Sequence, residues 1–345
     1  MSDSKIARPD KFRILIIGRA NAGKTTILRA VCGAEGEPDV YDQNGNKIIT
    51  SPKTTRSAIR TTLRTIRARL SREKPHPTGG KDSILSPSPL RGEHNIEYPL
   101  MFRGSPGFVF HDSRGFESGA VEELELAQKF IQNKANLGSM RNQLHAIWYC
   151  FSADSNRFMT AADKVFFDTI DTGTVPVIAI FTKFDALDAA AFSALSDQGV
   201  PFAEAQRRAP DHAREQFDQN LLPLIKQLAH PPRAVVCLRN MHNKGSQGAI
   251  KKAASELIES TGAALDDSAL KVLLVQAQCV NVELCMKAAV NSGVITKAAQ
   301  GAIQADPATF NPLQEKLIRE IFQWFPYIWV YNKVTFCIIC QLNIT

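Results

Sequence analysis

The chain has 345 residues, of which 44% are hydrophobic and 22% charged, and its formal net charge is +7. This length fits about two globular domains, and neither the first residues nor the interrupted apolar run at 324–340 resembles a signal peptide or a membrane span, so we expect a cytoplasmic protein. The seven cysteines are odd in number and scattered along the chain, which excludes a disulfide framework. The positive charge is local, because residues 51–92 carry a net charge of +8 and the rest of the chain −1.

Short apolar segments alternate with helical segments along most of the chain. Strands are expected at 11–17, 96–102, 108–111, 146–151, 175–181 and 234–238, and helices at 24–32 and 122–143. Buried strands that alternate with helices are typical of a mostly parallel sheet covered on both faces. We therefore predict an α/β fold with a doubly wound, mostly parallel sheet over 1–265, and a helical C-terminal extension with an aromatic tail over 266–345.

Residues 51–90 interrupt this pattern with a basic segment rich in Ser, Thr, Pro and Arg. Such a composition buries little apolar surface, which favours a disordered insertion. The alternative is a basic amphipathic helix that contacts an anionic membrane or nucleic acid. No RNA-binding motif accompanies the segment, so we expect no specific nucleic-acid partner.

The first motif that carries chemistry is Gly18-x-x-x-x-Gly23-Lys24-Thr25, between the first strand and the first helix. In this context the pattern is typical of a phosphate-binding loop, whose backbone N–H groups and helix N-terminus bind phosphate oxygens. Lys24 would reach the β- and γ-phosphates, and the Thr25 hydroxyl would bind Mg²⁺. The nucleotide-binding residues expected here are Gly18, Arg19, Asn21, Ala22, Gly23, Lys24, Thr25 and Thr26.

The second motif, Asp112-Ser113-Arg114-Gly115, follows an apolar strand. A carboxylate at Asp112 can contact Mg²⁺, and the N–H of Gly115 can sense a γ-phosphate. A lone Asp-x-x-Gly is a weak signal, because both residues are common in turns. Its order in the chain and its strand context give it weight.

The third motif, Thr182-Lys183-Phe184-Asp185, ends the strand VPVIAIF. Guanine presents an N1–H and an exocyclic amine on one edge, and a carboxylate at Asp185 can accept both hydrogen bonds, while the Lys183 stem lies along the ring face. A site built for such a pair can reject a base that lacks it by about 10⁴- to 10⁵-fold. The motif, which includes Thr182, therefore favours GTP over ATP.

Together these motifs resemble those of the translation-factor-related P-loop GTPases. The resemblance to the multi-copy small G-domain proteins of mushroom-type fungi is narrower and covers about residues 11–260. It rests on the segments RILIIGRANAGKTTI, RGEHNIE, GFVFHDSRGFESG, LHAIWYC and FTKFDAL. It implies a P-loop NTPase G domain that binds GTP with Mg²⁺ and hydrolyses it to GDP.

The resemblance also implies two further loops. The last base-contacting loop falls at Arg239-Asn240-Met241, where Asn240 and Met241 would contact guanine through the backbone, although the usual Ser-Ala is missing. The first switch falls at 91–95, which has no threonine to bind Mg²⁺. Either His94 or Ser88 takes that place, or the ligand comes from elsewhere.

The resemblance puts Phe116 where the GTPase template has a glutamine that orients the attacking water. We therefore expect slow turnover, about 10⁻⁴ per second. The catalytic groups expected are Lys24, Gly115 and Arg114; Arg19 is a second candidate arginine. Glu117, a partner or a second copy of the chain are further sources of a catalytic group.

Two functions remain open at this stage. The first is a slow GTPase that acts as a molecular switch toward an unknown effector or activating protein. The second is a GTP-dependent assembly or dimerisation module in which hydrolysis is incidental.

The C-terminal segment contains the aromatic residues Trp324, Phe325, Trp329 and Phe336. They predict a packing face, with membrane or partner contact as the alternative. Cys337 and Cys340 in the same segment are interpreted as core or interface thiols rather than metal ligands.

Overall fold

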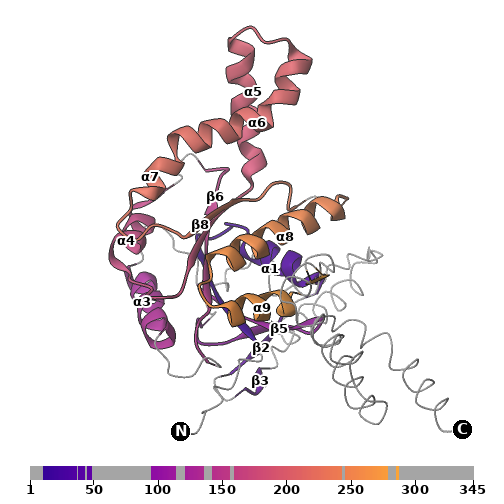
Figure 1. Cartoon of the computed structure of the whole chain (residues 1–345). Coiled ribbons are helices and arrows are strands. Elements are labelled where there is room, and N and C mark those ends of the chain that lie inside the picture. The colour runs from indigo at the N-terminus through magenta and orange to yellow at the C-terminus, as the bar shows by residue number, and fades with distance from the viewer. Residues whose placement is uncertain are drawn as a thin grey trace, which may run out of the picture.

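The computed structural model describes residues 11–36, 38–42, 45–48, 95–113, 121–135, 142–155, 159–242, 245–278 and 285–286. In this part of the chain, one sheet lies between two layers of helices (Figure 1). The basic segment 51–90, residues 114–120 and the aromatic tail lie outside the described residues.

The sheet has eight strands among the described residues, in the order β3-β2-β4-β5-β1-β6-β7-β8. Strands β1, β5, β6, β7 and β8 are mutually parallel, whereas β2, β3 and β4 pair antiparallel at one edge. The predicted mostly parallel sheet is therefore confirmed. The bounds are β1 (Phe12–Gly18), β2 (Asp39–Tyr41), β3 (Lys47–Ile48), β4 (Leu100–Phe102), β5 (Ser105–Asp112), β6 (Ala146–Ser152), β7 (Val177–Thr182) and β8 (Ala234–Cys237).

Helices cover both faces of the sheet. Figure 1 shows α1, α8 and α9 on one face, α3 and α4 on the other, and α5 and α6 as a hairpin that projects from the body. The bounds are α1 (Lys24–Cys32), α3 (Val121–Ala135), α4 (Ala161–Thr169), α5 (Asp188–Asp197), α6 (Phe202–Asn220), α7 (Leu222–Lys226), α8 (Gln247–Ala264) and α9 (Ser268–Ala277), with a 3₁₀ turn η2 (Phe184–Leu187).

The continuous apolar run Ile14–Ile17 of β1 accounts for the two helical layers. Ile14 and Ile16 belong to the buried cluster under α1, α8 and α9, whereas Leu15 and Ile17 belong to the cluster under α3 and α4. Successive side chains of a strand point to opposite faces, so a strand apolar at every position needs cover on both sides. The central strand therefore dictates a doubly wound architecture.

Two predicted elements differ most from their bounds in the structure, whereas the other strands shift by one to three residues at their ends. The strand expected at 96–102 is confined to β4, because the Asn95 side chain accepts a hydrogen bond from the Glu97 N–H and its carbonyl accepts one from the Tyr98 N–H, which makes a turn. The helix expected at 122–143 ends at Ala135, whose carbonyl accepts a hydrogen bond from the Gln143 side chain. The Asn95 side chain thus satisfies a backbone group where the expected strand would have begun.

The last described helices pack on the sheet. Trp148 in β6 donates its indole N–H to the Thr261 hydroxyl of α8 over 3.1 Å, and Ser105 in β5 donates to the carbonyl oxygen of Ala277 in α9 over 3.3 Å. The domain boundary near 265 stays a prediction. No helix in the described ranges is both long enough and apolar enough to cross a membrane.

Candidate nucleotide site

Three of the predicted loops begin at one edge of the sheet. Strands β1, β5 and β7 are parallel and end at Gly18, Asp112 and Thr182. Strand β1 has β5 on one side and β6 on the other, which is the point where the strand order reverses. In open α/β sheets, ligands bind at the carboxyl ends of the strands at such a reversal.

The loop after β1 has a backbone that turns through unusual conformations. Gly18 has φ +148° and Gly23 has φ +76°, and Asn21 between them has φ +62°. A Cβ atom at Gly18 would lie 2.5 Å from the carbonyl oxygen of Cys150, so the approach of β6 by itself requires glycine there. Gly23 is the N-cap of α1 and provides no side-chain cap, so the first N–H groups of the helix need acceptors from elsewhere.

Lys24 joins the first motif to the second. Its ammonium donates to the carbonyl oxygen of Gly18 over 3.0 Å and lies 3.8 Å from Oδ1 of Asp112. Both side chains are mostly buried, with 11% of Lys24 and 18% of Asp112 exposed. Low exposure strengthens the attraction between these two charges compared with a surface pair.

Thr182 joins the third motif to the first. Its hydroxyl lies 3.1 Å from the carbonyl oxygen of Ala22 in the phosphate loop and 3.1 Å from that of Phe151 in β6. The residue is 3% exposed. A buried hydroxyl held between two backbone carbonyls fixes the spacing of the two loops.

Lys183 lies beside an acidic residue that the sequence analysis missed. Its ammonium binds Oδ2 of Asp154 over 2.7 Å, and its backbone has φ +52°. Burial alone would raise the pKa of Asp154, but hydrogen bonds from Lys183 and Ser152 outweigh it and lower the pKa. Asp154 therefore stays ionised. The signal that points to it is its position just after the apolar strand AIWYCFS, at the carboxyl edge of the sheet.

Asp185 contacts the last predicted loop. Its Oδ1 accepts a hydrogen bond from the Asn240 N–H over 2.8 Å, and the Phe184 N–H donates to the carbonyl oxygen of Leu238 over 3.0 Å. Asn240 has φ +55°. The side chain of Met241 packs against the apolar cluster under α1 and α8.

The strained residues are concentrated in these loops. Asn21, Lys183 and Asn240 are the non-glycine residues with positive φ among those that the structure describes. Each belongs to a different predicted nucleotide loop. Such conformations cost about 1–3 kcal/mol each and tend to occur at functional sites.

Thr26 and Arg19 are two further residues of the predicted phosphate loop. Thr26 is exposed on the first turn of α1, and Arg19 is half-buried. Arg114 and Gly115 lie outside the described residues, as does the predicted first switch except for Asn95. Their roles stay predictions.

The oxygen ligands expected for Mg²⁺ are Thr25 and Asp112. Within the described ranges, no three His, Cys, Asp or Glu side chains gather into a ready-made metal site. Mg²⁺ is commonly held by one or two protein oxygens together with substrate phosphates and water, so a hydroxyl and a carboxylate beside a phosphate loop fit this ion. Burial raises the pKa of the nearby Cys150 thiol to about 12, and thiolate sulfur is not a ligand that Mg²⁺ prefers.

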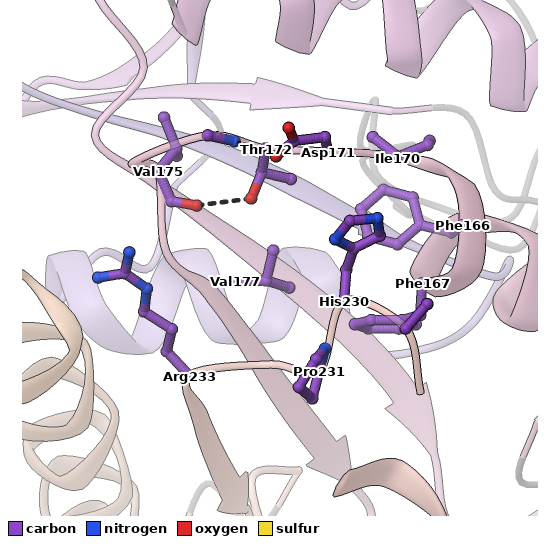
Figure 2. A pocket seen from close by; sticks show the side chains of 12 residues that line it. Phe166, Phe167, Ile170, Asp171, Thr172, Val175, Val177, His230, Pro231 and Arg233 are labelled. Carbon is purple, nitrogen blue, oxygen red and sulfur yellow. Dashed lines mark hydrogen bonds between the residues drawn. The ribbon is translucent and has the colours of Figure 1, made fainter. Parts of the chain in front are cut away.

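Two cavities lie in the described part of the chain. One, of about 210 Å³, is at the opposite edge of the sheet, where Phe166, Thr172, His230 and Arg233 line it (Figure 2). A second, of about 360 Å³, lies on the α5–α6 hairpin between Phe192 and Phe202. The first is smaller than the roughly 300–1,000 Å³ typical of ligand pockets, and more of its exposed lining is polar than apolar. Neither cavity is lined by a residue of the three motifs.

No protein-family model matches the chain, and no curated protein matches it either. Among solved structures, an oligomerised bacterial dynamin pair is similar with 10% identity and a TM-score of 0.35, over 90% of this chain and 45% of that one. NFeoB of S. thermophilus, a mutant bound to GDP, is similar with 13% identity and a TM-score of 0.32, over 93% of this chain and 94% of that one. The chain thus spans less than half the length of the dynamin chain.

Proposed function

We propose that this protein binds GTP and GDP with Mg²⁺ and hydrolyses GTP slowly, as a molecular switch. The observation that carries the proposal is the contact of Thr182 with Ala22, which joins the guanine motif to the phosphate loop. Two supporting contacts are those of Lys24 with Asp112 and of Asp185 with Asn240. A base-reading loop and a phosphate-binding loop held side by side are what a nucleoside triphosphate requires.

The phosphates would bind the loop after β1. The N-terminus of α1 carries partial positive charge and N–H groups without helical acceptors, which favours anions. Lys24, now held by Gly18 and facing Asp112, would turn its ammonium to the β- and γ-phosphates. Gly18, Arg19, Asn21, Ala22, Gly23, Thr25 and Thr26 would complete this part of the site.

Thr25 and Asp112 would hold Mg²⁺, directly or through water. The ion supplies positive charge that neutralises the phosphate oxygens when it is bound. Asp112 also keeps the Lys24 ammonium close to the loop, because their atoms are 3.8 Å apart. This contact supports a shared phosphate and metal site.

The guanine base would lie between Lys183 and the loop of Asn240 and Met241. Asp185 would accept the N1–H and the exocyclic amine, and the Lys183 stem would cover one ring face. The hydrogen bond from the Asn240 N–H already orients the Asp185 carboxylate. A preoriented carboxylate loses less entropy on binding, which favours guanine over adenine.

Hydrolysis is expected to be slow, because Phe116 can neither donate nor accept a hydrogen bond to the attacking water. Lys24, the Gly115 amide and an arginine, either Arg114 or Arg19, would stabilise the transition-state charge. An activating protein or a second copy of the chain would supply the missing group that orients the attacking water. An effector would then read the difference between the GTP and GDP states.

The test is calorimetric titration of GTP, GDP and ATP, with and without Mg²⁺, on the wild type and on Asp185→Ala and Asp185→Asn. We expect ATP to bind about 10⁴-fold more weakly than GTP. Asp185→Ala should bind GDP poorly, whereas Asp185→Asn should prefer xanthosine diphosphate, because an amide presents one donor and one acceptor. Asp197→Asn, an exposed carboxylate at the end of α5, is the control. Failure of the wild type to bind any guanosine phosphate would refute the proposal.

Single-turnover hydrolysis and molecular mass, measured with GDP and with a non-hydrolysable GTP analogue, separate a switch from an assembly module. A switch hydrolyses GTP and keeps one mass in both states. An increase in mass with the analogue, without turnover, would favour GTP-dependent dimerisation.

A further inference from the structure

Arg239 lies two residues after the end of β8, and its side chain makes three contacts. One guanidinium nitrogen, Nη1, donates to Oδ1 of Asp188 over 2.6 Å, and Nη2 donates to the carbonyl oxygen of Pro210 over 2.9 Å. The guanidinium carbon lies 4.9 Å from the centroid of the Phe184 ring. With 27% of the side chain exposed, these contacts are partly shielded from water.

The three partners come from the guanine motif and from the two helices that follow it in the chain. Phe184 lies between Lys183 and Asp185 in the guanine motif, and Asp188 begins α5 directly after that motif. Pro210 lies inside α6. A single side chain from the last loop therefore connects the guanine motif to both helices of the projecting hairpin.

Arginine suits this position better than other cations. Its planar guanidinium can stack on an aromatic ring while its edge donates to two acceptors in different directions, which an ammonium group cannot do. The Phe184 ring is fully buried and packs edge-to-face on Phe217, with centroids 5.2 Å apart. The guanidinium therefore rests on a fixed surface.

The backbone next to Arg239 makes the contact that orients the base-reading carboxylate. Asn240 follows Arg239 and donates its N–H to Asp185 while its backbone has φ +55°. A non-glycine residue in this conformation persists only when its surroundings hold it there. Arg239, the residue before Asn240, provides an ionic contact with Asp188 and an aromatic contact with Phe184.

We propose that Arg239 is a positioning residue for guanine recognition: it anchors the last loop to the guanine motif so that the Asn240 N–H orients Asp185 toward the base. The inference rests on the proposed function. It assigns to Arg239 no contact with the nucleotide itself. Its loss should change how well the site distinguishes bases, rather than only how tightly it binds phosphates.

The experiment compares GDP with inosine diphosphate, which lacks only the exocyclic amine, on the wild type and on Arg239→Met. The wild type should bind GDP about 10- to 100-fold more tightly than inosine diphosphate, as expected for one hydrogen bond to a carboxylate. In Arg239→Met this preference should fall by about fivefold or more, because Asp185 is no longer held. A purely structural role would weaken both ligands equally and leave the ratio unchanged.

Arg214→Met is the matched control. Arg214 also pairs with a carboxylate, Asp218, over 2.9 Å and lies over an aromatic ring, Phe217, at 5.9 Å, but it belongs to α6 and contacts neither base loop. It should keep the wild-type ratio. Unfolding midpoints in urea show whether each variant is folded under the binding conditions.

Arg239→Lys and Asp188→Asn keep the proposal testable if Arg239→Met does not fold. Lysine retains the charge and N–H donors but not the planar group, so its ratio should lie between those of the wild type and the methionine variant. Asp188→Asn should lower the ratio less than Arg239→Met. Wild-type ratios in folded Arg239→Met, or in both of the milder variants, would overturn the inference. If the wild type binds neither nucleotide, the proposed function fails instead.

Discussion

The hydroxyl of Thr182 lies 3.1 Å from the carbonyl oxygen of Ala22, although the two residues are 160 positions apart in the chain. The same hydroxyl lies 3.1 Å from the carbonyl oxygen of Phe151. One side chain thus links the end of β7, the end of β6 and the phosphate loop. The relative position of the base and phosphate loops depends on this small buried group.

Replacing Thr182 with valine, which has nearly the same shape, should lower the free energy of unfolding by about 1–2 kcal/mol, since the buried carbonyl oxygens beside it lose the one hydroxyl proton that they share. GDP should bind about fivefold more weakly, because the loops lose their spacer. Urea unfolding and calorimetry measure the two effects. Thr261→Val is the control: Thr261 is also a buried threonine that donates to a carbonyl, that of Leu257, but on α8. It should lose stability while keeping GDP affinity, and equal affinity losses in both variants would contradict the prediction.

Gly18→Ala should destabilise the fold by about 3 kcal/mol, because the new Cβ combines a disfavoured backbone with a clash in the core. The clash is with the Cys150 carbonyl oxygen, at 2.5 Å. Gly173→Ala is the control, since Gly173 also has positive φ, +58°, but nothing lies within 4 Å of its added Cβ. The free energy of unfolding of Gly173→Ala should fall by about 1 kcal/mol. Guanidinium unfolding of both variants gives the difference, and similar losses would show that β6 does not constrain Gly18.

Asp112→Asn should abolish most of the dependence of GDP binding on Mg²⁺. An amide oxygen is a weaker ligand than a carboxylate for a hard cation, and it no longer attracts Lys24. The ratio of the GDP dissociation constants with and without Mg²⁺, measured by calorimetry, should move toward one. A ratio equal to that of the wild type would exclude Asp112 from the metal site. Asp197→Asn again serves as the control.

The stability of the fold should fall on acidification because of His111, which is 2% exposed. Burial, and next the charge of Arg13, lower the pKa of His111 to about 3. The Arg13 guanidinium can only donate, so it donates to Nε2 over 2.8 Å, and Nδ1 carries the proton and donates to the Ile96 carbonyl oxygen over 2.8 Å. The folded state therefore keeps a neutral imidazole where the unfolded chain, with an ordinary pKa of about 6.5, is protonated.

Between pH 6.5 and 3 the unfolded chain thus binds one proton more at this residue, so stability falls as pH falls through that range. From pH 7 to pH 5 the loss due to His111 alone should be about 2 kcal/mol. His111→Gln keeps a polar side chain without a titrating group, and its stability should fall less over the same interval. Urea unfolding at the two pH values provides the comparison. Parallel losses in both proteins would assign the acid sensitivity to other groups.

Local patterns in the sequence were sufficient for the central architecture. The apolar runs of β1, β6 and β7 predict buried strands, because a strand apolar at every position is stable only when both faces are covered. Gly18, Gly23 and Lys24 between a strand and a helix predict the turn of the phosphate loop for an equally local reason. Where a polar side chain turns the backbone, as Asn95 does, the apolar pattern alone placed the strand boundary wrongly.

Contacts between distant residues were decided only by the tertiary structure. Nothing near Lys183 in the chain indicates Asp154 as its ionic partner, and nothing near Arg239 indicates Asp188 and Pro210. The sheet order places these side chains together, because strands that are remote in sequence end at the same edge. The residue types and their local spacing therefore determine which loops form, whereas the packing of strands and helices determines which side chains in those loops meet.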